Sequence, residues 1–319
     1  MSRLPKIRAG ITMGDPSGIG PDITIKALNR LKGLADFVVI GDGWVLGKAG
    51  KGKLKDAKII DLNNVSHKGF EFGKVKGEYG RASMEYLDKA MQLLKNREID
   101  CLVTCPISKE AINLGGFEYS GHTEYLSCKS AVKDVTMMLL SNSLKISLVT
   151  RHIPLKDAPG KIKGANILKT VEHTFKALRQ LFGVQRPKIA ICGINPHASD
   201  NGLIGEEENK TIIPAIKKIR RRLRINIDGP LPADSAIYKT KNKSYDAVVA
   251  MYHDQALIPL KLSGKFDGVN LTLGLPFIRT SPLHGVAFDI AKKPGLANPG
   301  SLIAAIKLAV KCASSQKRD

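Results

Sequence analysis

The sequence predicts an α/β fold built from two subdomains. Short apolar runs alternate with longer segments of helical spacing in the first hundred residues, a pattern typical of a parallel or mixed sheet covered by helices. The chain has 319 residues, which is enough for two hydrophobic cores. Neither an internal repeat nor a low-complexity linker interrupts the pattern. We therefore expect two α/β/α subdomains with mixed sheets.

The first half of the chain opens on a strand and a tight turn at 8–15. A Gly-rich turn then leads into a helix, where Pro21 and Asp22 suit the first helical turn. The other elements expected in this half are strands at 35–42, 57–62 and 101–107 and a helix at 81–99.

The pattern changes after residue 134. Two strand-like runs within 135–155 predict an antiparallel hairpin that turns at 141–143. A strand at 188–198 ends in a His-bearing loop, and Gly183 is placed to end the helix before it. Helices are expected at 164–183, 205–223 and 300–314. We expect residues 1–130 with 285–319 to form the first subdomain and residues 131–284 to be inserted as the second.

Composition excludes several protein classes. The hydrophobic content of 43% and charged content of 25% are ordinary for a soluble globular protein. No run of 18 apolar residues indicates a membrane span, and the N-terminus lacks a signal-peptide core, so we expect a cytoplasmic protein. The five cysteines are too few for a disulfide framework, and Cys101 and Cys105 are expected as small buried side chains.

The net charge is +21, from 50 Lys and Arg against 29 Asp and Glu. Such an excess raises the question of a nucleic-acid ligand. The basic runs are scattered, for example at 217–224 and 239–243, and aromatic residues make up only 5% of the chain, so no stacking platform for bases is evident. We expect no nucleic-acid partner, and a positive field that attracts anionic substrates.

The segment 246–299 is the most informative part of the sequence. An apolar run at 247–251 predicts a buried strand that delivers the residues YHDQ into a loop, as open α/β sheets present chemistry at their carboxyl edge. The pattern HG-x-A-x-D-I-A…ANPG at 284–300 suits close approach of the backbone to a ligand. The segment therefore predicts part of an enzyme active site.

Three histidines share one context. His152, His197 and His253 each follow an apolar, strand-like run, so they can meet at one edge of the fold. Three imidazoles with an open coordination position suit a catalytic divalent metal. The alternative is that they are polar loop residues at the ends of strands.

Cations in apolar surroundings predict an anion site. Lys261 and Arg279 are flanked by apolar residues, where a cation is unfavourable unless an anion pairs with it. A phosphate or carboxylate ligand would supply that partner. His122 and Thr123 stand at an expected helix start and can bind an anion there, or Thr123 or Ser120 caps the helix.

Two further loops leave their role open. Asp234 follows two prolines and can hold a substrate amine or hydroxyl, or cap a helix. The run GDPSGIGP at 14–21 lacks the Lys and Ser or Thr of a P-loop. It is either a ligand-facing loop or only a turn from strand to helix.

Several long motifs carry a family resemblance. They are ITMGDPSGIGP, TCPISKEAIN, SGHTEYL, INPHASDNG with IGEEE, GPLPADS, AMYHDQALIPLK and GVNLTLGLPFIRTSPLHG. With them the chain resembles the 4-hydroxythreonine-4-phosphate dehydrogenase family from residue 8 to about 310. The HG…ANP ending is also similar to the nucleotide loop of isocitrate and isopropylmalate dehydrogenases. The resemblance implies their fold, with the active site in the cleft between the two subdomains.

The resemblance implies an NAD- or NADP-dependent enzyme of pyridoxal 5′-phosphate (vitamin B6) biosynthesis. It would oxidise the 3-hydroxyl of 4-phosphooxy-L-threonine, and the resulting β-keto acid would lose CO₂ to give 3-amino-2-oxopropyl phosphate. It also implies one divalent metal per subunit (zinc, magnesium or cobalt) and a homodimer with the active site at the subunit interface.

The resemblance also assigns roles to residues. The metal ligands would be His152, His197 and His253. The substrate would contact His122, Thr123, Lys261, Asn270 and Arg279. The nucleotide cofactor would contact His284, Asp289 and Asn298, and the candidate catalytic groups for proton transfer are Lys261 and Asp234.

Small departures from the family pattern keep alternatives open. Cys105 and Ser108 differ from the expected residues, and the HASDNG loop differs from the commoner form, so substrate choice is in question. A sister group with the same three histidines acts on D-threonate or D-erythronate 4-phosphate. A metal-dependent phosphohydrolase would also use three histidines, but it would not need the nucleotide loop.

Overall fold

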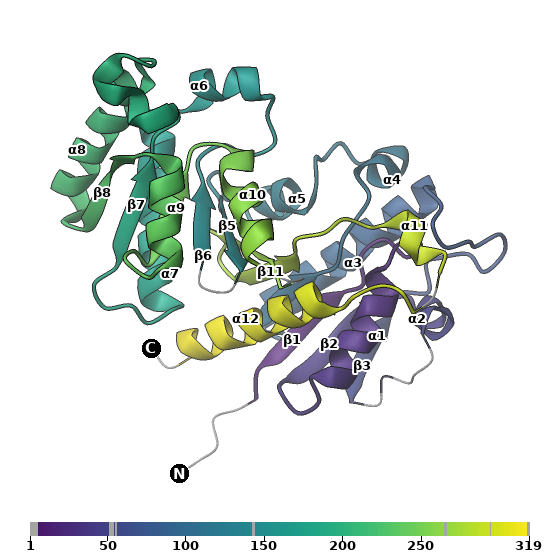
Figure 1. Ribbon diagram of the computed structural model, residues 1–319. Helices are drawn as coiled ribbons and strands as arrows, with labels where there is room; N and C mark the ends of the chain where they lie inside the picture. The colour runs from purple at the N-terminus through teal and green to yellow at the C-terminus, as the bar shows by residue number, and fades with distance from the viewer. Residues whose placement is uncertain are drawn as a thin grey trace, which may run out of the picture. The chain divides into compact units, whose positions relative to one another are not determined.

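The computed structural model describes residues 6–50, 54, 56–141, 144–264, 267–293 and 295–317. The chain divides into two compact units, which we call unit 1 (Met1–Lys133 with Leu275–Arg318) and unit 2 (Asp134–Gly274). Both units combine strands and helices, so the expected mixed α/β fold is confirmed (Figure 1). The return to unit 1 comes at residue 275 rather than at the expected 285, which places Arg279 in unit 1.

Unit 1 contains a parallel sheet. Its strands lie in the order β3-β2-β1-β4-β11, and all their pairings are parallel. The strands β4 and β11 are buried along their whole length and β1 along all but its first residue, as expected for parallel strands covered on both faces. Their bounds are Arg8–Thr12 (β1), Asp36–Gly41 (β2), Ala57–Asp61 (β3), Cys101–Thr104 (β4) and Ile278–Pro282 (β11).

Helices cover the unit 1 sheet. The helix α12 packs against β11 and β4 and also contacts α1, while α3 packs against β1, β2 and the short helix α4 (Figure 1). The apolar residues of α12 recur at helical spacing and are buried. The helices are α1 (Gly20–Arg30), α2 (Gly43–Ala49), α3 (Gly77–Lys95), α4 (Lys109–Leu114), α5 (His122–Lys129), α11 (Phe288–Ala291) and α12 (Gly300–Gln316).

Unit 2 contains a mixed sheet in the order β10-β5-β6-β9-β7-β8. The pairs β10–β5 and β5–β6 are antiparallel and the remaining pairs are parallel. The expected hairpin is confirmed as β5 and β6, although its turn residues 142–143 lie outside the described residues. The bounds are Thr136–Ser141 (β5), Leu144–Leu148 (β6), Lys188–Cys192 (β7), Asn226–Leu231 (β8), Ala247–Ala250 (β9) and Val269–Leu273 (β10).

Two groups of helices pack on this sheet. The helices α7 and α8 share a core with β7 and β9, to which Ala247 and Val249 contribute. Because side chains alternate along a strand, Val248 and Ala250 face the other side, where α9 and α10 contact β9. The helices are α6 (Ala158–Lys161), α7 (Gly164–Gln180), α8 (Ile213–Leu223), α9 (Ala233–Lys241) and α10 (His253–Ser263).

Irregular segments join these elements. A short 3-10 helix (Leu155–Asp157) precedes α6, a turn at Pro196–Gly202 follows β7, and a single π turn (Glu208–Ile212) leads into α8, where one continuous helix at 205–223 was expected. The helix α7 ends at Gln180 with Leu181 as its C-cap, so the expected cap at Gly183 is wrong by two residues; Gly183 follows with a positive φ of 71°, and its N–H bonds to the Arg179 carbonyl.

Two expectations from composition can be compared with the structure. Cys101 and Cys105 are buried free thiols, as expected. Within the described ranges, we find no helix with the length and apolarity needed to span a bilayer.

Candidate active site

A buried cation marks the carboxyl edge of the unit 1 sheet. Arg279 on β11 is only 2% exposed, and its Nε and Nη2 donate to the Thr104 hydroxyl at the end of β4, at 3.2 and 2.7 Å. Burial lowers the pKa of Arg279 to about 10, and the nearby Glu124 carboxylate opposes this shift. The guanidinium therefore stays charged at neutral pH, and Arg279 is a buried cation whose described neighbours include the polar groups of Thr104, Glu124 and His122.

His122 lies beside this cation at the first residue of α5. The backbone of Cys105 hydrogen-bonds its ring, while its Nε2 is buried and has no hydrogen-bond partner among the described residues. Burial, reinforced by the positive charge of Arg279, holds the pKa of His122 well below its usual value. The ring is therefore neutral, and Nε2 is the atom it can offer to a ligand.

The start of α5 resolves the capping alternative. The N-cap residue is Gly121, with φ 155°, and no side chain caps this end, so neither Ser120 nor Thr123 has that role. Thr123 is 7% exposed in the first turn. His122, Thr123 and Arg279 therefore all belong to unit 1, and Thr104 is an addition that the sequence analysis missed. The sequence signal that could have identified Thr104 was its position at the end of the apolar run 101–104.

The two departures in the TCPISKEA motif have structural roles. The Ser108 hydroxyl accepts the N–H of Ala111 and caps α4. The buried Cys105 thiol lies 3.3 Å from the Thr24 hydroxyl. Neither side chain therefore carries an argument about substrate choice.

The expected nucleotide loop at 284–298 forms hydrogen bonds with the helix α1 and with the residue that precedes it. The Ile19 N–H donates to the Val286 carbonyl at 3.0 Å, and the Lys26 ammonium donates to the Ala297 carbonyl at 2.9 Å. A Cβ on Gly73 would lie 2.5 Å from the Phe288 carbonyl oxygen. Three segments that are distant in the sequence thus meet at this loop.

The predicted cofactor residues differ in their surroundings. The His284 ring contacts the Gly285 carbonyl through Nδ1, and burial lowers its pKa. Asp289 is exposed in the short helix α11. The Asn298 side chain accepts the N–H of Gly300 at 2.8 Å, so it also stabilises the start of α12.

The GDPSGIGP run is a turn with a buried carboxylate inside it. Asp15 is 0% exposed, and its Oδ1 accepts the N–H and the hydroxyl of Ser17 at 2.9 and 3.1 Å. Its Oδ2 is buried without a partner among the described residues, and burial raises the pKa of Asp15 to about 6. The N–H groups of Ser17, Gly18 and Ile19 all bond within the protein, so this turn does not cradle a phosphate.

In unit 2, two of the three predicted metal ligands lie together. The rings of His152 and His253 have centroids 5.4 Å apart, following the ends of β6 and β9. His253 Nδ1 lies 2.6 Å from a carboxylate oxygen of Asp254. His197 follows the end of β7 but is not gathered with them, because no group of three His, Cys, Asp or Glu side chains at metal-binding separations occurs among the described residues.

His197 begins an unusual stretch of backbone. Five successive residues without glycine, 197–201, take left-handed φ values between 44° and 71°. For L-residues this conformation costs roughly 1–2 kcal/mol per residue. Contacts elsewhere in unit 2 must therefore hold the loop in this path.

The remaining predicted residues of unit 2 are mostly at its surface. Lys261 is exposed on the last turn of α10, so the expectation that it lies in apolar surroundings is wrong. Asn270 is buried on β10, at 7% exposure. Asp234 is exposed in the first turn of α9 and does not cap it. With Asp254 and Gln255, Asp234 lines a hollow of about 530 Å³.

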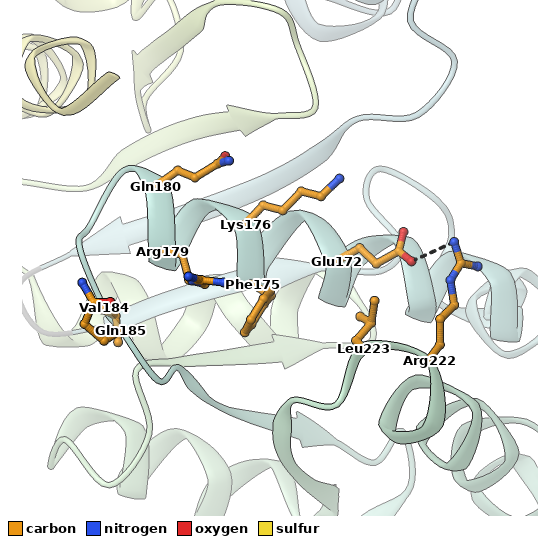
Figure 2. Close-up of a pocket in the computed structure, with 9 residues that line it drawn as sticks. All are labelled: Glu172, Phe175, Lys176, Arg179, Gln180, Val184, Gln185, Arg222 and Leu223. Carbon is orange, nitrogen blue, oxygen red and sulfur yellow. Dashed lines mark ion pairs between the residues drawn. The ribbon is translucent and has the colours of Figure 1, made fainter. Parts of the chain in front are cut away.

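A larger hollow in unit 2, of about 690 Å³, contains none of the predicted residues. Figure 2 shows its lining side chains on α7, in the segment that follows α7 and at the end of α8, and Arg222 is paired to Glu172 at 3.4 Å. The Arg179 guanidinium lies 5.9 Å from the Phe175 ring centre. Size alone therefore does not identify the active site.

The comparisons with known proteins decide the family. The model of the family described as pyridoxal phosphate biosynthetic protein PdxA matches residues 22–309. The chain belongs to the PdxA family. The resemblance found in the sequence is thereby confirmed.

Similar proteins cover nearly the whole chain. A 4-hydroxythreonine-4-phosphate dehydrogenase from Sulfurihydrogenibium sp. is 45% identical, over 95% of this chain and 98% of its own length. A D-threonate 4-phosphate dehydrogenase from Cupriavidus necator is 41% identical, over 95% of this chain and 96% of its own length. Membership of the family, together with these relatives, makes the chain an oxidoreductase of the dehydrogenase class.

Solved structures agree on the fold. The crystal structure of a 4-hydroxythreonine-4-phosphate dehydrogenase from Klebsiella pneumoniae has a TM-score of 0.86 and 36% identity, and covers 97% of this chain and 99% of that one. A β-decarboxylating dehydrogenase from Thermococcus kodakarensis has a TM-score of 0.51 at 14% identity, with 94% and 81% covered, which supports a shared fold alone.

Proposed function

We propose that this PdxA-family chain oxidises the 3-hydroxyl of 4-phosphooxy-L-threonine with NAD or NADP and releases CO₂, giving 3-amino-2-oxopropyl phosphate for pyridoxal 5′-phosphate biosynthesis. The observation that carries the proposal is the buried, charged Arg279 beside the neutral His122, in a chain that is 45% identical to a dehydrogenase named for this substrate. A buried guanidinium is stabilised by an anionic ligand, and this substrate is an anion at both ends.

In this proposal the unit 1 residues bind one charged end of the substrate. Arg279 and the Thr123 hydroxyl donate to its phosphate or carboxylate oxygens, and His122 Nε2 accepts from a neighbouring donor group of the substrate. Because His122 is neutral, it can donate from Nε2 only if its other nitrogen accepts, so its hydrogen bond to the Cys105 backbone fixes Nδ1 as the donor and Nε2 as the acceptor. A substrate hydroxyl or ammonium is therefore the partner that Nε2 favours.

The unit 2 histidines are the proposed metal ligands. Their imidazole nitrogens suit zinc or cobalt, and the 5.4 Å separation of the His152 and His253 rings allows both to reach one ion. When bound, the ion would lower the pKa of the substrate hydroxyl and polarise the ketone that follows. Asp254 accepts from Nδ1 of His253, which leaves Nε2 with its lone pair for the ion. Asp234 and Lys261 are the candidate proton acceptors.

The loop at 284–298 is the proposed cofactor site, with His284, Asp289 and Asn298 as its polar contacts. Two of its backbone carbonyls, those of Val286 and Ala297, are held by hydrogen bonds from Ile19 and Lys26. We further propose a cytoplasmic homodimer in which both subunits contribute to each active site.

The alternative substrate is D-threonate 4-phosphate, because a relative at 41% identity carries that name. The two substrates differ at one position, where the amino acid has an ammonium and the sugar acid has a hydroxyl. The acceptor character proposed for His122 Nε2 does not separate them, since both groups can donate a hydrogen bond.

A substrate comparison tests the proposal. NADH and NADPH formation would be followed with 4-phosphooxy-L-threonine and with D-threonate 4-phosphate, each with and without a chelator. We expect a higher kcat/KM for the amino-acid phosphate and loss of activity on chelation. A higher kcat/KM for the sugar acid would select the alternative. Phosphate release without reduced nucleotide would contradict both.

A further inference from the structure

A buried carboxylate supports the loop that carries His197. The run of three glutamates at 206–208 contains two exposed or partly exposed residues and one, Glu208, that is 0% exposed. Glu208 Oε1 accepts the backbone N–H groups of Ile194 and Asn195 at 2.8 and 2.9 Å, and its Oε2 accepts from the Asn195 amide at 2.8 Å. All three bonds go to the loop between β7 and His197.

The loop packs directly on this carboxylate. A Cβ added to Gly193 would lie 2.8 Å from Glu208 Oε1 and 2.9 Å from the Ala198 Cα. Glycine is therefore required at 193, and Glu208 lies against the start of the left-handed stretch. Since charged hydrogen bonds are the stronger kind, Glu208 can hold a backbone path that L-residues disfavour.

Gln255 joins this loop to the strand that precedes His253. Its Oε1 accepts the Met251 N–H at 2.7 Å, and its Nε2 donates to the Gly193 carbonyl at 2.9 Å. The side chain is 9% exposed. Only an amide supplies both an acceptor and a donor here, because a carboxylate would place an oxygen against the Gly193 carbonyl.

Met251, the residue that follows β9, also binds the segment that carries His152. The Thr150 hydroxyl and N–H both donate to the Met251 carbonyl, at 2.7 and 3.2 Å. A connected series of hydrogen bonds thus runs from Thr150 through Met251, Gln255 and Gly193 to the loop that Glu208 holds. It links the three segments that carry His152, His253 and His197.

We propose that Glu208 and Gln255 are positioning residues for a divalent metal held by His152, His253 and, once its side chain turns toward them, His197. Gln255 fixes the ends of β7 and β9 relative to each other, and Glu208 holds the left-handed path on which His197 lies. Neither side chain touches the ion. The inference rests on the proposed metal ligands and adds to them the residues that set their spacing.

Metal binding tests the proposal without any substrate. The protein is freed of metal, and Co²⁺ affinity is measured by competition with an indicator chelator in wild type, Glu208→Gln and Gln255→Met. Partners that orient metal ligands typically contribute about 10–100-fold in affinity. We expect losses in that range for both variants, with a change in the visible absorption spectrum of bound Co²⁺. The matched control is Glu206→Gln, which removes an exposed carboxylate paired to Lys210 and should stay within about 2-fold.

A second substitution separates positioning from folding. Gln255→Glu keeps the acceptor for Met251 but repels the Gly193 carbonyl, so we expect it to bind Co²⁺ as weakly as Gln255→Met. Wild-type affinity in Glu208→Gln and Gln255→Met, even with lowered melting temperatures, would overturn the positioning role. Equal losses in Glu206→Gln would overturn it too. Absence of Co²⁺ binding by the wild type is a different result, which refutes the proposed metal function itself.

Discussion

Two predicted substrate-binding residues of unit 1 are buried, whereas most of the predicted site residues in unit 2 are exposed. Arg279 and Thr123 are 2% and 7% exposed, and the pKa values of Arg279 and His122 are shifted by burial before any ligand binds. His152, His197 and Lys261 lie at the surface of unit 2. The fold of unit 1 therefore fixes the charge states of Arg279 and His122, while the proposed metal ligands of unit 2 lie on loops that buried polar side chains support.

The difference follows from where the side chains are attached. In unit 1 they lie on the buried strand β11 and in the first turn of α5. In unit 2 the histidines follow strand ends, where the chain turns into loops. Open loops need buried polar support, which Glu208 and Gln255 provide.

Removal of the metal should have the largest effect. If the exposed histidines hold the ion, chelation or His253→Ala should lower kcat/KM by more than roughly 10³-fold, because the hydroxyl would lose its acidification. Steady-state NADH formation measures this, and added Co²⁺ should restore the chelated wild type but not the variant. If activity survives both treatments, the histidines of unit 2 do not bind a metal that the reaction needs.

The buried cation should outweigh the exposed one. Arg279→Met leaves the substrate anion without its partner in a buried site, and we expect kcat/KM to fall by about 10²–10³-fold. If Asp234 is the proton acceptor, Lys261→Met changes only an exposed side chain and should lower kcat/KM by no more than about 10-fold. Thermal melting should show that both variants fold. A larger loss for Lys261→Met than for Arg279→Met would show that the exposed cation of unit 2 contributes more to activity than the buried cation of unit 1.

The buried carboxyl of unit 1 should make stability depend on pH. Burial raises the pKa of Asp15 from 3.8 to about 6, so the folded state binds a proton there more tightly than the unfolded chain does. This contribution to stability is present below about pH 4 and is lost as the pH rises through 6. Asparagine avoids burying the charge, so Asp15→Asn should raise the free energy of unfolding by about 2–3 kcal/mol at pH 7.5 and by little at pH 4.

Denaturant unfolding at the two pH values measures this effect. The exposed Asp289 provides the control, because Asp289→Asn should change the free energy of unfolding by less than about 0.5 kcal/mol at either pH. A gain from Asp15→Asn that is the same at pH 4 and 7.5 would show that burial of the charge is not its cause.

The smallest effect should come from the end of the proposed nucleotide loop. Asn298→Ala removes the hydrogen bond to the Gly300 N–H, and loss of such a hydrogen bond costs about 1 kcal/mol of stability. If this hydrogen bond is its main role, KM for the nucleotide should change by less than about 2-fold while the melting temperature falls. A rise in KM without a change in melting temperature would assign Asn298 to the cofactor instead.

Arg279 and Lys261 show how far the sequence could predict the site. Both have apolar neighbours in the chain, and both were expected to be buried. On β11 this holds, because a strand covered on both faces buries every residue. On α10 it fails, because adjacent residues point in different directions around a helix, and Ile258 and Leu262 are themselves 59% and 84% exposed.

The supporting residues could not be predicted from the sequence. Glu208 stands in a run of three glutamates, and only the π turn after it decides which of them faces the loop. The burial of Asp15 involves residues that are distant in the chain: its N–H bonds to the Pro106 carbonyl, and its partner Ser17 bonds to the Lys74 carbonyl. The strands and helices themselves were predictable, since their apolar spacing reflects the cores they form.

The left-handed stretch at 197–201 has a consequence for how this loop can change. A backbone that turns the opposite way to a normal helix excludes β-branched side chains and tolerates Asn, Asp and Gly. The left-handed backbone conformation, more than the chemistry of the side chains, therefore limits which amino acids can occupy positions 198–201. Polar substitutions drawn from that small set can alter the charge and reach of the loop surface while His197 keeps its place.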